Sequence, residues 1–178
     1  LLCSGDKHEQ GGVCHIYDFA TKALRLITRS TYSSELLGAC DSFDHALMIV
    51  FILNEIVKGV PSKLDQVKLR ENGGFAIPAI LYVDALSVQM SVCATYIKPP
   101  AEKGLLAHVQ YLREAMERQI LFALAWLDTR DMTADGLTKG SVDRALLHKV
   151  MNGELQFHHP LKYWRPPLLI KQTREQDT

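Results

Sequence analysis

The segment AIPAILYVD, from Ala76 to Asp84, is an almost uninterrupted apolar run that ends on a carboxylate. A continuous apolar run of this length is typical of a central strand that is buried on both faces of a sheet. Helices cover both faces of such sheets, so the segment indicates an α/β fold. It also predicts that Asp84 lies at the end of a buried strand, where open α/β sheets collect functional groups.

A second buried strand is expected at ILFALAWL, from Ile120 to Leu127, and it leads directly into the acidic stretch DTRDMTADGLTKG. Between the two strands, apolar residues from Glu102 to Gln119 recur at helical spacing, which predicts a helix. DALSVQMSVCATYI is expected to start another helix after Asp84. A final helix is expected to open in DMTADGLTKG and to run through ALLHKVMNG.

The N-terminal part predicts strands at LLCSGD and GGVCHIYDF and a third at ALRLIT, from Ala23 to Thr28. Short connections between them indicate a three-strand meander. Ser30 and Thr31 are candidate N-caps for a long helix from Ser33 to about Lys58, and VPSKLDQVKLRENGG is expected to be a surface excursion. The order predicts an initial antiparallel meander followed by parallel strands, in one mixed sheet flanked by helices.

The bulk composition is that of a globular protein, with 178 residues, 47% hydrophobic and 22% charged. We expect one domain over residues 1–164 and a tail over 165–178 that packs on protein subunits of a larger complex. The zero formal net charge argues against binding of nucleic acid by bulk electrostatics alone and leaves room for a local basic patch. We expect no membrane span, and LLCSG looks like the start of a piece of a longer protein.

The four cysteines, at positions 3, 14, 40 and 93, have no zinc-site spacing. We therefore expect free thiols in a reducing, intracellular compartment. The pattern does not distinguish nucleus, cytoplasm and organelle.

Four carboxylates fall at predicted element boundaries, namely Asp6, Glu35, Asp84 and Asp135. Carboxylates that converge from separate elements repel one another, and divalent metal offsets the repulsion. Oxygen ligands suit Mg²⁺ or Mn²⁺, and two such ions about 4 Å apart form a phosphoryl-transfer site. Taken singly, each acid also fits an ordinary helix cap or a solvated position.

Four blocks of this sequence resemble the ribonuclease H domain of Copia-type retrotransposon Pol polyproteins. TRSTYSSELLGA is similar to the lead into the helix with the family's catalytic Glu, and LYVDALSV to its strand-terminal Asp followed by Ser. AEKGLLAHVQYLREAME resembles the helix with an early Lys and an Arg-Glu pair. WLDTRDMTADGLTKG resembles the terminal signature and is the most specific block. The resemblance covers roughly residues 11 to 164.

The resemblance implies a ribonuclease H-like fold and cleavage of RNA in RNA–DNA hybrids with two Mg²⁺. Glu35, Asp84 and Asp135 would be catalytic metal ligands, with Asp131 as a helix cap and Asp128 as a loop acid. The family also has an Asp in the first strand, and only KHEQ separates the candidate Asp6 from Gly11. Either the hairpin is tightened, or that acid lies upstream of Leu1, or it has been lost. Candidate nucleic-acid contacts are Ser87, Lys103, Arg113 and Lys139.

Two other functions remain open. A catalytically degenerate ribonuclease H-like module could serve as a structural subunit of a larger assembly such as a ribonucleoprotein, bound to RNA. LYVDA is similar to the Tyr-x-Asp-Asp motif of reverse transcriptases, but Ala85 stands where the second carboxylate is required. Adjacent histidines point in different directions, so we expect His158 and His159 to lie at a surface or interface.

Overall fold

The computed structural model describes residues 2–4, 11–21, 28–138, 140–141 and 143–166 and shows a mixed α/β protein with two small sheets. The chain divides into two compact units, which are described separately. The first unit comprises Leu1–Leu26 and Leu127–Lys162, and the second comprises Ile27–Trp126 and Tyr163–Thr178.

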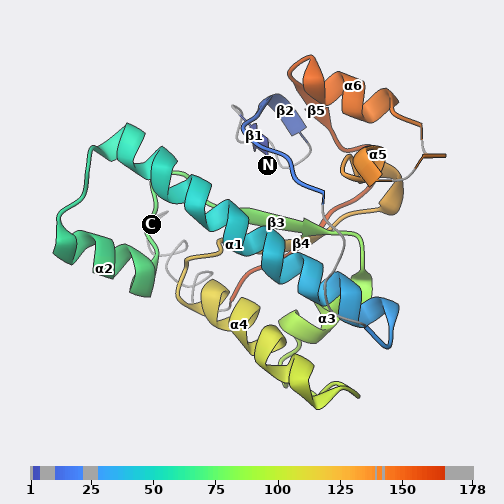
Figure 1. Ribbon diagram of the computed structural model, residues 1–178, viewed down its shortest axis with the longest axis horizontal. Helices are drawn as coiled ribbons and strands as arrows, with labels where there is room; N and C mark the ends of the chain where they lie inside the picture. The colour runs from blue at the N-terminus through green and yellow to red at the C-terminus, as the bar shows by residue number, and fades with distance from the viewer. Residues whose placement is uncertain (1, 5–10, 22–27, 139, 142, 167–178) are drawn as a thin grey trace, which may run out of the picture. The chain divides into compact units, whose positions relative to one another are not determined.

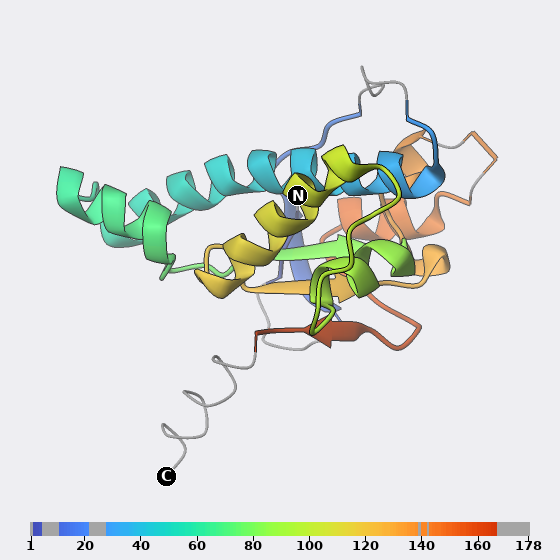
Figure 2. The same ribbon diagram turned by 90° about the horizontal axis from the view of Figure 1, so that it is seen from below.

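The sheet of the second unit confirms the two strands predicted from apolar runs. β3 (Ile80–Val83) and β4 (Ala123–Trp126) pair in parallel, with Val83 opposite Trp126. A third strand, β6 (Lys162–Trp164), lies beside β4 and makes the sheet mixed, as Figure 2 shows. Both parallel strands therefore end at the same edge, and Asp84 follows β3 directly.

Helices supply most of the core of the second unit. They are α1 (Thr31–Lys58), α3 (Leu86–Cys93), the 3₁₀ turn η1 (Lys103–Leu105) and α4 (Leu106–Glu117), whereas α2 (Lys63–Asn72) has no buried residue. Side chains from α1, α3 and α4 pack with β3 and β4 in one cluster, which includes the fully buried Leu36, Phe43, Val88, Leu112 and Met116. This cluster fixes the helices against the β3–β4 pair.

The long helix α1 starts where a capping residue was predicted. The Ser30 hydroxyl accepts the backbone N–H of Ser33 at 3.2 Å, and this satisfies one of the unpaired donors at the helix start.

By length and composition α1 could also cross a membrane, because an 18-residue window has a mean hydropathy of 1.7 and is 28% buried. Core helices of soluble proteins pass the same test, so the expectation of no membrane span stays a prediction.

The first unit contains an antiparallel sheet in the order β1 (Leu2–Ser4), β2 (Gly11–Ile16) and β5 (Glu154–Gln156). The helix α6 (Ala145–Met151) packs on this sheet through buried residues, and the Cys14 thiol points at the carbonyl of Val150. Along the chain, the 3₁₀ turn η2 (Thr129–Asp131) and the short helix α5 (Asp135–Thr138) follow β4 and precede α6.

Several sequence predictions differ from this structure. The predicted third strand of the meander lies almost entirely in residues 22–27, outside the described residues, and the described neighbour of β2 on its other edge is β5.

The predicted final helix is wrong, because the chain forms α5 and α6 with a break between them. Gly140 disfavours a helix there, and the Asp143 carboxylate accepts the N–H of Ala145 where α6 starts. The surface excursion contains α2, which we did not predict. The ribonuclease H-like order of strands stays a prediction.

The chain after β6 remains on the second unit for at least two residues. The Trp164 ring packs under the Arg113 guanidinium at 4.5 Å, and the Arg165 guanidinium lies 4.2 Å above the Phe122 ring. Pro166 is buried. A tail that leaves the domain immediately at residue 165 is therefore wrong for Arg165 and Pro166, and residues 167–178 lie outside the described part.

Candidate functional site

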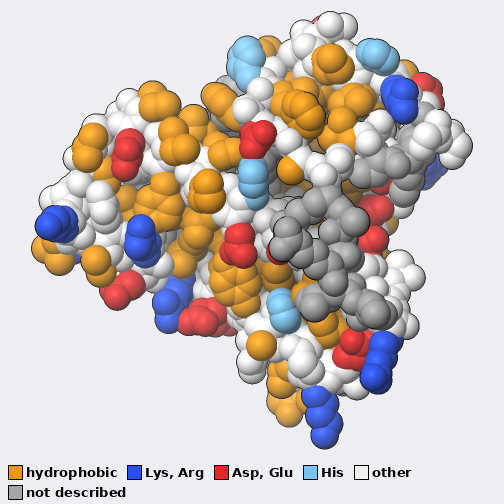
Figure 3. Space-filling view, viewed as in Figure 1, with side chains coloured by type: hydrophobic (Ala, Val, Ile, Leu, Met, Phe, Trp, Pro, Cys, Tyr) orange, Lys and Arg blue, Asp and Glu red, His pale blue; other side chains and the backbone are white. Residues whose placement is uncertain are grey.

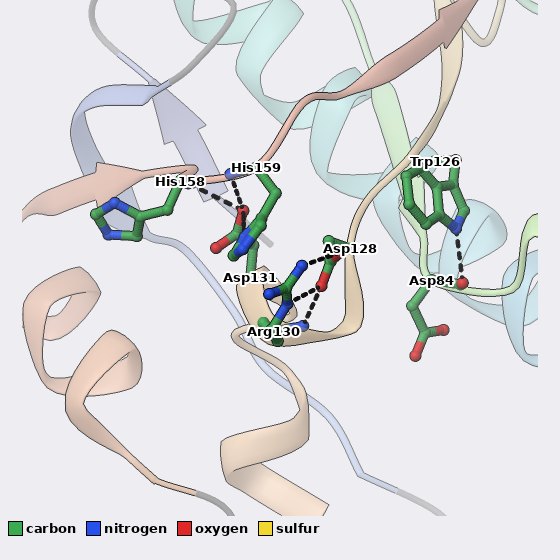
Figure 4. A network of polar contacts seen from close by, with 7 residues as sticks. All are labelled: Asp84, Trp126, Asp128, Arg130, Asp131, His158 and His159. Atoms are coloured by element: carbon green, nitrogen blue, oxygen red, sulfur yellow. Dashed lines mark hydrogen bonds and ion pairs between the residues drawn. The ribbon is translucent and has the colours of Figure 1, made fainter.

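Asp84 lies at the carboxyl end of β3, as predicted. Its backbone carbonyl accepts a hydrogen bond from the Trp126 indole Nε1 at 2.9 Å, so the ends of the two parallel strands are tied together. The Asp84 side chain is half-buried, and Figure 4 shows its carboxylate directed away from the Trp126 ring. α3 begins two residues later, and the positive end of a helix dipole favours negative charge nearby.

Glu35 lies on the exposed side of α1, in its second turn, because the helix already begins at Thr31. The Tyr32 hydroxyl, one turn earlier, hydrogen bonds to the Ser91 hydroxyl of α3 at 2.8 Å. In Figures 1 and 2 the start of α1 lies at the same end of the second unit as α3 and the end of β3. Glu35 and Asp84 therefore belong to elements that meet at one end of this unit.

The other two predicted ligands lie elsewhere in the chain. Asp135 is the first residue of α5 in the first unit and is half-buried. Asp6 lies outside the described residues. Convergence of Asp135 with Glu35 and Asp84 thus stays a prediction.

The predicted nucleic-acid contacts divide by exposure. Ser87, in the first turn of α3, and Lys103, in η1, are exposed, and Lys139 lies outside the described residues. Arg113 has a different set of contacts: its Nη1 donates to the carbonyls of Val92 and Ala94 at 2.9 and 3.0 Å. Its Nε donates to Glu117 at 2.8 Å. This guanidinium closes the C-terminal end of α3 and stacks on Trp164, so it is held within the fold.

A hollow of about 300 Å³ beside the start of α1 adds a cation that the sequence analysis missed. Arg29 lines it together with Ser30, Ser33 and Glu102, and the buried Ser33 hydroxyl donates to the Glu102 carboxylate at 2.9 Å. Arg29 and Lys103 are both exposed, and Lys103 follows Glu102 in the chain. Arg29 and Glu102 are distant in the sequence and line the same hollow only in the fold, so the sequence carried no signal for Arg29.

The acidic stretch after β4 has a structural arrangement in the first unit that we did not predict. Asp131 is 2% exposed, and its Oδ2 accepts the backbone N–H groups of His158 and His159 at 2.9 and 2.8 Å. The His159 Nδ1 lies 3.1 Å from the same oxygen. Asp131 is therefore a buried anchor between η2 and the segment after β5, as Figure 4 shows, and its assignment as a helix cap was wrong.

Asp128 is the N-cap of the 3₁₀ turn η2. Its carboxylate accepts the Arg130 backbone N–H at 3.0 Å and two bonds from the Arg130 guanidinium at 2.9 Å each. These hydrogen bonds from Arg130 hold the pKa of Asp128 well below its usual range. The acid predicted to be a loop residue is thus the N-cap of η2, and it forms an ion pair with the exposed Arg130.

The donors available to a metal are carboxylate oxygens, which suit Mg²⁺ or Mn²⁺. In the part of the chain that the structure describes, no group of three or more His, Cys, Asp or Glu side chains is arranged to hold a metal ion. The assignment of Glu35, Asp84, Asp135 and Asp6 as metal ligands therefore stays a prediction.

Comparison of the chain with models of protein families, with curated proteins and with solved structures gave no match.

Proposed function

We propose that this chain carries a ribonuclease H-like site that hydrolyses the RNA strand of an RNA–DNA hybrid. The main support is the position of Asp84 at the carboxyl end of β3, with its backbone fixed by Trp126. The start of α1, which carries Glu35, lies at the same end of the second unit. The resemblance of the four sequence blocks adds Asp135 as a third ligand and Asp6 as the candidate for a fourth.

Mg²⁺, when bound by these carboxylates, would supply the activation of a water molecule and the stabilisation of charge on the leaving oxygen. The residues of the chain provide fixed positions for the carboxylates. Trp126 holds the end of β3 against β4, and the Tyr32–Ser91 hydrogen bond holds the start of α1 against α3. Rigid placement matters because a catalytic site tolerates errors of only about half an ångström.

Arg29 and Lys103 are proposed to contact the phosphate backbone of the hybrid. Both are exposed cations beside the start of α1, and most contacts between proteins and nucleic acids go to phosphate oxygens. Arg113 is left out of this role because the carbonyls of α3, Glu117 and Trp164 already surround its guanidinium. Local cations of this kind are compatible with a formal net charge of zero.

A structural role in a larger assembly is the second candidate. It is favoured by the formal net charge of zero and by the four residues, KHEQ, that separate Asp6 from Gly11, a short spacing for the first-strand acid of the family. In this case the chain would bind RNA or a hybrid, or pack on other subunits, without cleaving a substrate.

The test is cleavage of a synthetic RNA–DNA hybrid with Mg²⁺ by the wild type, Glu35→Gln, Asp84→Asn, Asp135→Asn and Asp6→Asn. Loss of one ligand is expected to lower the rate on the order of a thousandfold. Asp65→Asn, on the exposed helix α2, is the matched control and should retain the wild-type rate. Full activity in Asp84→Asn would refute the proposed site.

Two further variants separate binding from chemistry. Arg29→Gln and Lys103→Gln are expected to raise KM and to reduce its salt dependence, with kcat little changed. A wild-type protein that binds the hybrid but does not cleave it would support the structural role instead.

A further inference from the structure

The hollow beside the start of α1 is lined by two opposite charges that do not pair with each other. Arg29 and Glu102 both line this space of about 300 Å³, and within the described part of the chain no ion pair joins them. Arg29 is exposed and Glu102 is half-buried. A ligand that carries both an anionic group and a hydrogen-bond donor can therefore contact the two side chains at once.

A chain of hydrogen bonds fixes the Glu102 carboxylate through one of its oxygens. The hydroxyl of the buried Ser33 donates to Glu102 Oε1 at 2.9 Å. Because this hydroxyl has a single hydrogen, it accepts in its 2.7 Å contact with the Ser30 hydroxyl, so the Ser30 hydrogen is used as well. Glu102 has no further partner among the described residues. Its second oxygen, Oε2, can thus accept a hydrogen bond from a ligand in the hollow, whereas neither serine has a hydrogen left to donate.

A carboxylate in this position distinguishes an RNA backbone from a DNA backbone. Next to the phosphates that Arg29 and Lys103 are proposed to contact, an ionised carboxylate is repulsive unless the ligand supplies a donor. The sugar–phosphate backbone of RNA has such a donor in every nucleotide, the 2′-hydroxyl, and that of DNA has none. Lys and Arg side chains are scattered over the coloured surface in Figure 3, so on this face a backbone is recognised by individual side chains.

We propose that this hollow binds one ribonucleotide of the RNA strand, with Glu102 accepting the 2′-hydroxyl and Arg29 contacting the neighbouring phosphate. Pro100, Ala101 and Leu105 supply apolar walls for the carbon atoms of the ribose. Glu102 favours RNA through a charge-assisted hydrogen bond and disfavours a backbone without the donor by repulsion. The inference rests on the proposed function for the nature of the ligand, but it concerns binding alone and needs neither metal nor cleavage.

The test measures Kd of the full chain for two labelled RNA–DNA hybrids by fluorescence anisotropy, in EDTA so that no metal-dependent cleavage occurs. One hybrid has a natural RNA strand. In the other, fluorine replaces each 2′-hydroxyl, which keeps the RNA-like sugar conformation but removes the donor. The wild type is expected to bind the natural hybrid about tenfold more tightly. Glu102→Gln keeps an acceptor for Ser33 and should reduce this ratio, because it binds the fluorinated hybrid more tightly once the repulsion is removed.

Two further variants serve as controls. Glu71→Gln removes the same charge from the exposed end of α2, at the other end of α1 from the hollow in Figure 1, and should keep the wild-type ratio. Arg29→Gln should weaken the binding of both hybrids by a similar factor, because both carry the phosphates.

Equal Kd values of the wild type for the two hybrids, or an unchanged ratio in Glu102→Gln, would overturn this inference. Cleavage of the natural hybrid with Mg²⁺ in that case would leave the proposed nuclease function standing alone. A ratio that depends on Glu102 in a protein that does not cleave would support the ribonucleotide site and refute the nuclease function. A wild type that binds neither hybrid would overturn both.

Discussion

The Trp126 indole donates a hydrogen bond to the backbone carbonyl of Asp84 at 2.9 Å and so ties the ends of the two parallel strands together. Trp126→Phe keeps an aromatic ring but removes the donor and leaves this carbonyl unpaired. We expect a loss of about 1 to 3 kcal/mol of unfolding free energy in the second unit. Urea denaturation and hydrogen exchange of the Asp84–Val88 amides measure it. Unchanged exchange of those amides would show that the bond does not hold this end of the sheet.

The buried Asp131 carboxylate is expected to matter more for stability than Asp128. Asp131→Ala removes the acceptor of two backbone N–H groups, which we expect to cost about 2 to 5 kcal/mol. Asp131→Asn retains one acceptor oxygen and should recover part of the loss. Asp128→Ala, in an ion pair with the exposed Arg130, is the control and should have the smaller effect. The measurement is hydrogen exchange of the first unit, with the His158 and His159 amides as reporters, and equal losses for the two alanine variants would contradict this account.

Arg113 is expected to stabilise the C-terminal end of α3 through the shape of its guanidinium. Lys preserves the charge but not the planar fork that reaches the Val92 and Ala94 carbonyls while stacking on Trp164. Arg113→Lys should therefore lose most of the stability that Arg113→Ala loses. Arg118→Lys is a suitable control because Arg118 makes an exposed ion pair with Glu114. Wild-type protection of the α3 amides in Arg113→Lys would show that charge alone suffices.

Cys40 and Cys93 are expected to be unreactive in the folded protein. Burial raises the pKa of each thiol to about 12, and for Cys40 the charges of Asp44 and Asp41 add to the shift. Iodoacetamide should therefore modify both slowly near pH 8 in the native state and rapidly in denaturant.

The same pKa shifts predict a loss of stability at alkaline pH. Above the unfolded value of 9.0 the unfolded chain releases thiol protons that the folded chain keeps, so the unfolding free energy falls as pH rises from about 9 towards 12. Burial also raises the pKa of Tyr111, which acts in the same direction. Cys40→Ala should flatten this decline, and an unchanged slope would contradict the assignment.

Local signals predicted part of the fold. The apolar run to Asp84 predicted β3, because a strand buried on both faces needs consecutive apolar residues. Ser30 predicted the start of α1, because a helix N-cap needs a residue of this type directly before the helix. A cap signal was also present for α2, since the Ser62 hydroxyl accepts the Asp65 N–H, but its polar sequence indicated a surface loop. β5 and β6 are three residues each, too short for a periodicity.

The arrangement around Asp131 and Arg113 was beyond sequence reasoning for a different reason. Asp131 accepts hydrogen bonds from backbone N–H groups that lie 27 and 28 residues later in the chain. Every residue except proline has such a group, so the residue types do not indicate which of them Asp131 binds. Arg113 reaches carbonyls of another helix, so its spacing suggested a solvated helix face. Asp84 and Glu35 could be selected as candidates because they stand at or near element boundaries, whereas their geometry with Asp135 depends on contacts between distant segments.

The most direct test of a shared metal site is paramagnetic broadening by Mn²⁺, which substitutes for Mg²⁺ at oxygen ligands. Mn²⁺ is titrated into the isotope-labelled full chain, and amide signals are followed by NMR. We predict that the signals of Glu35, Asp84 and Asp135 broaden together at low Mn²⁺, and that Mg²⁺ reverses the effect. In Asp84→Asn all three should lose this broadening, whereas Asp65→Asn should behave as the wild type. Broadening that leaves Asp135 unaffected, or that persists in Asp84→Asn, would contradict a common site for these carboxylates.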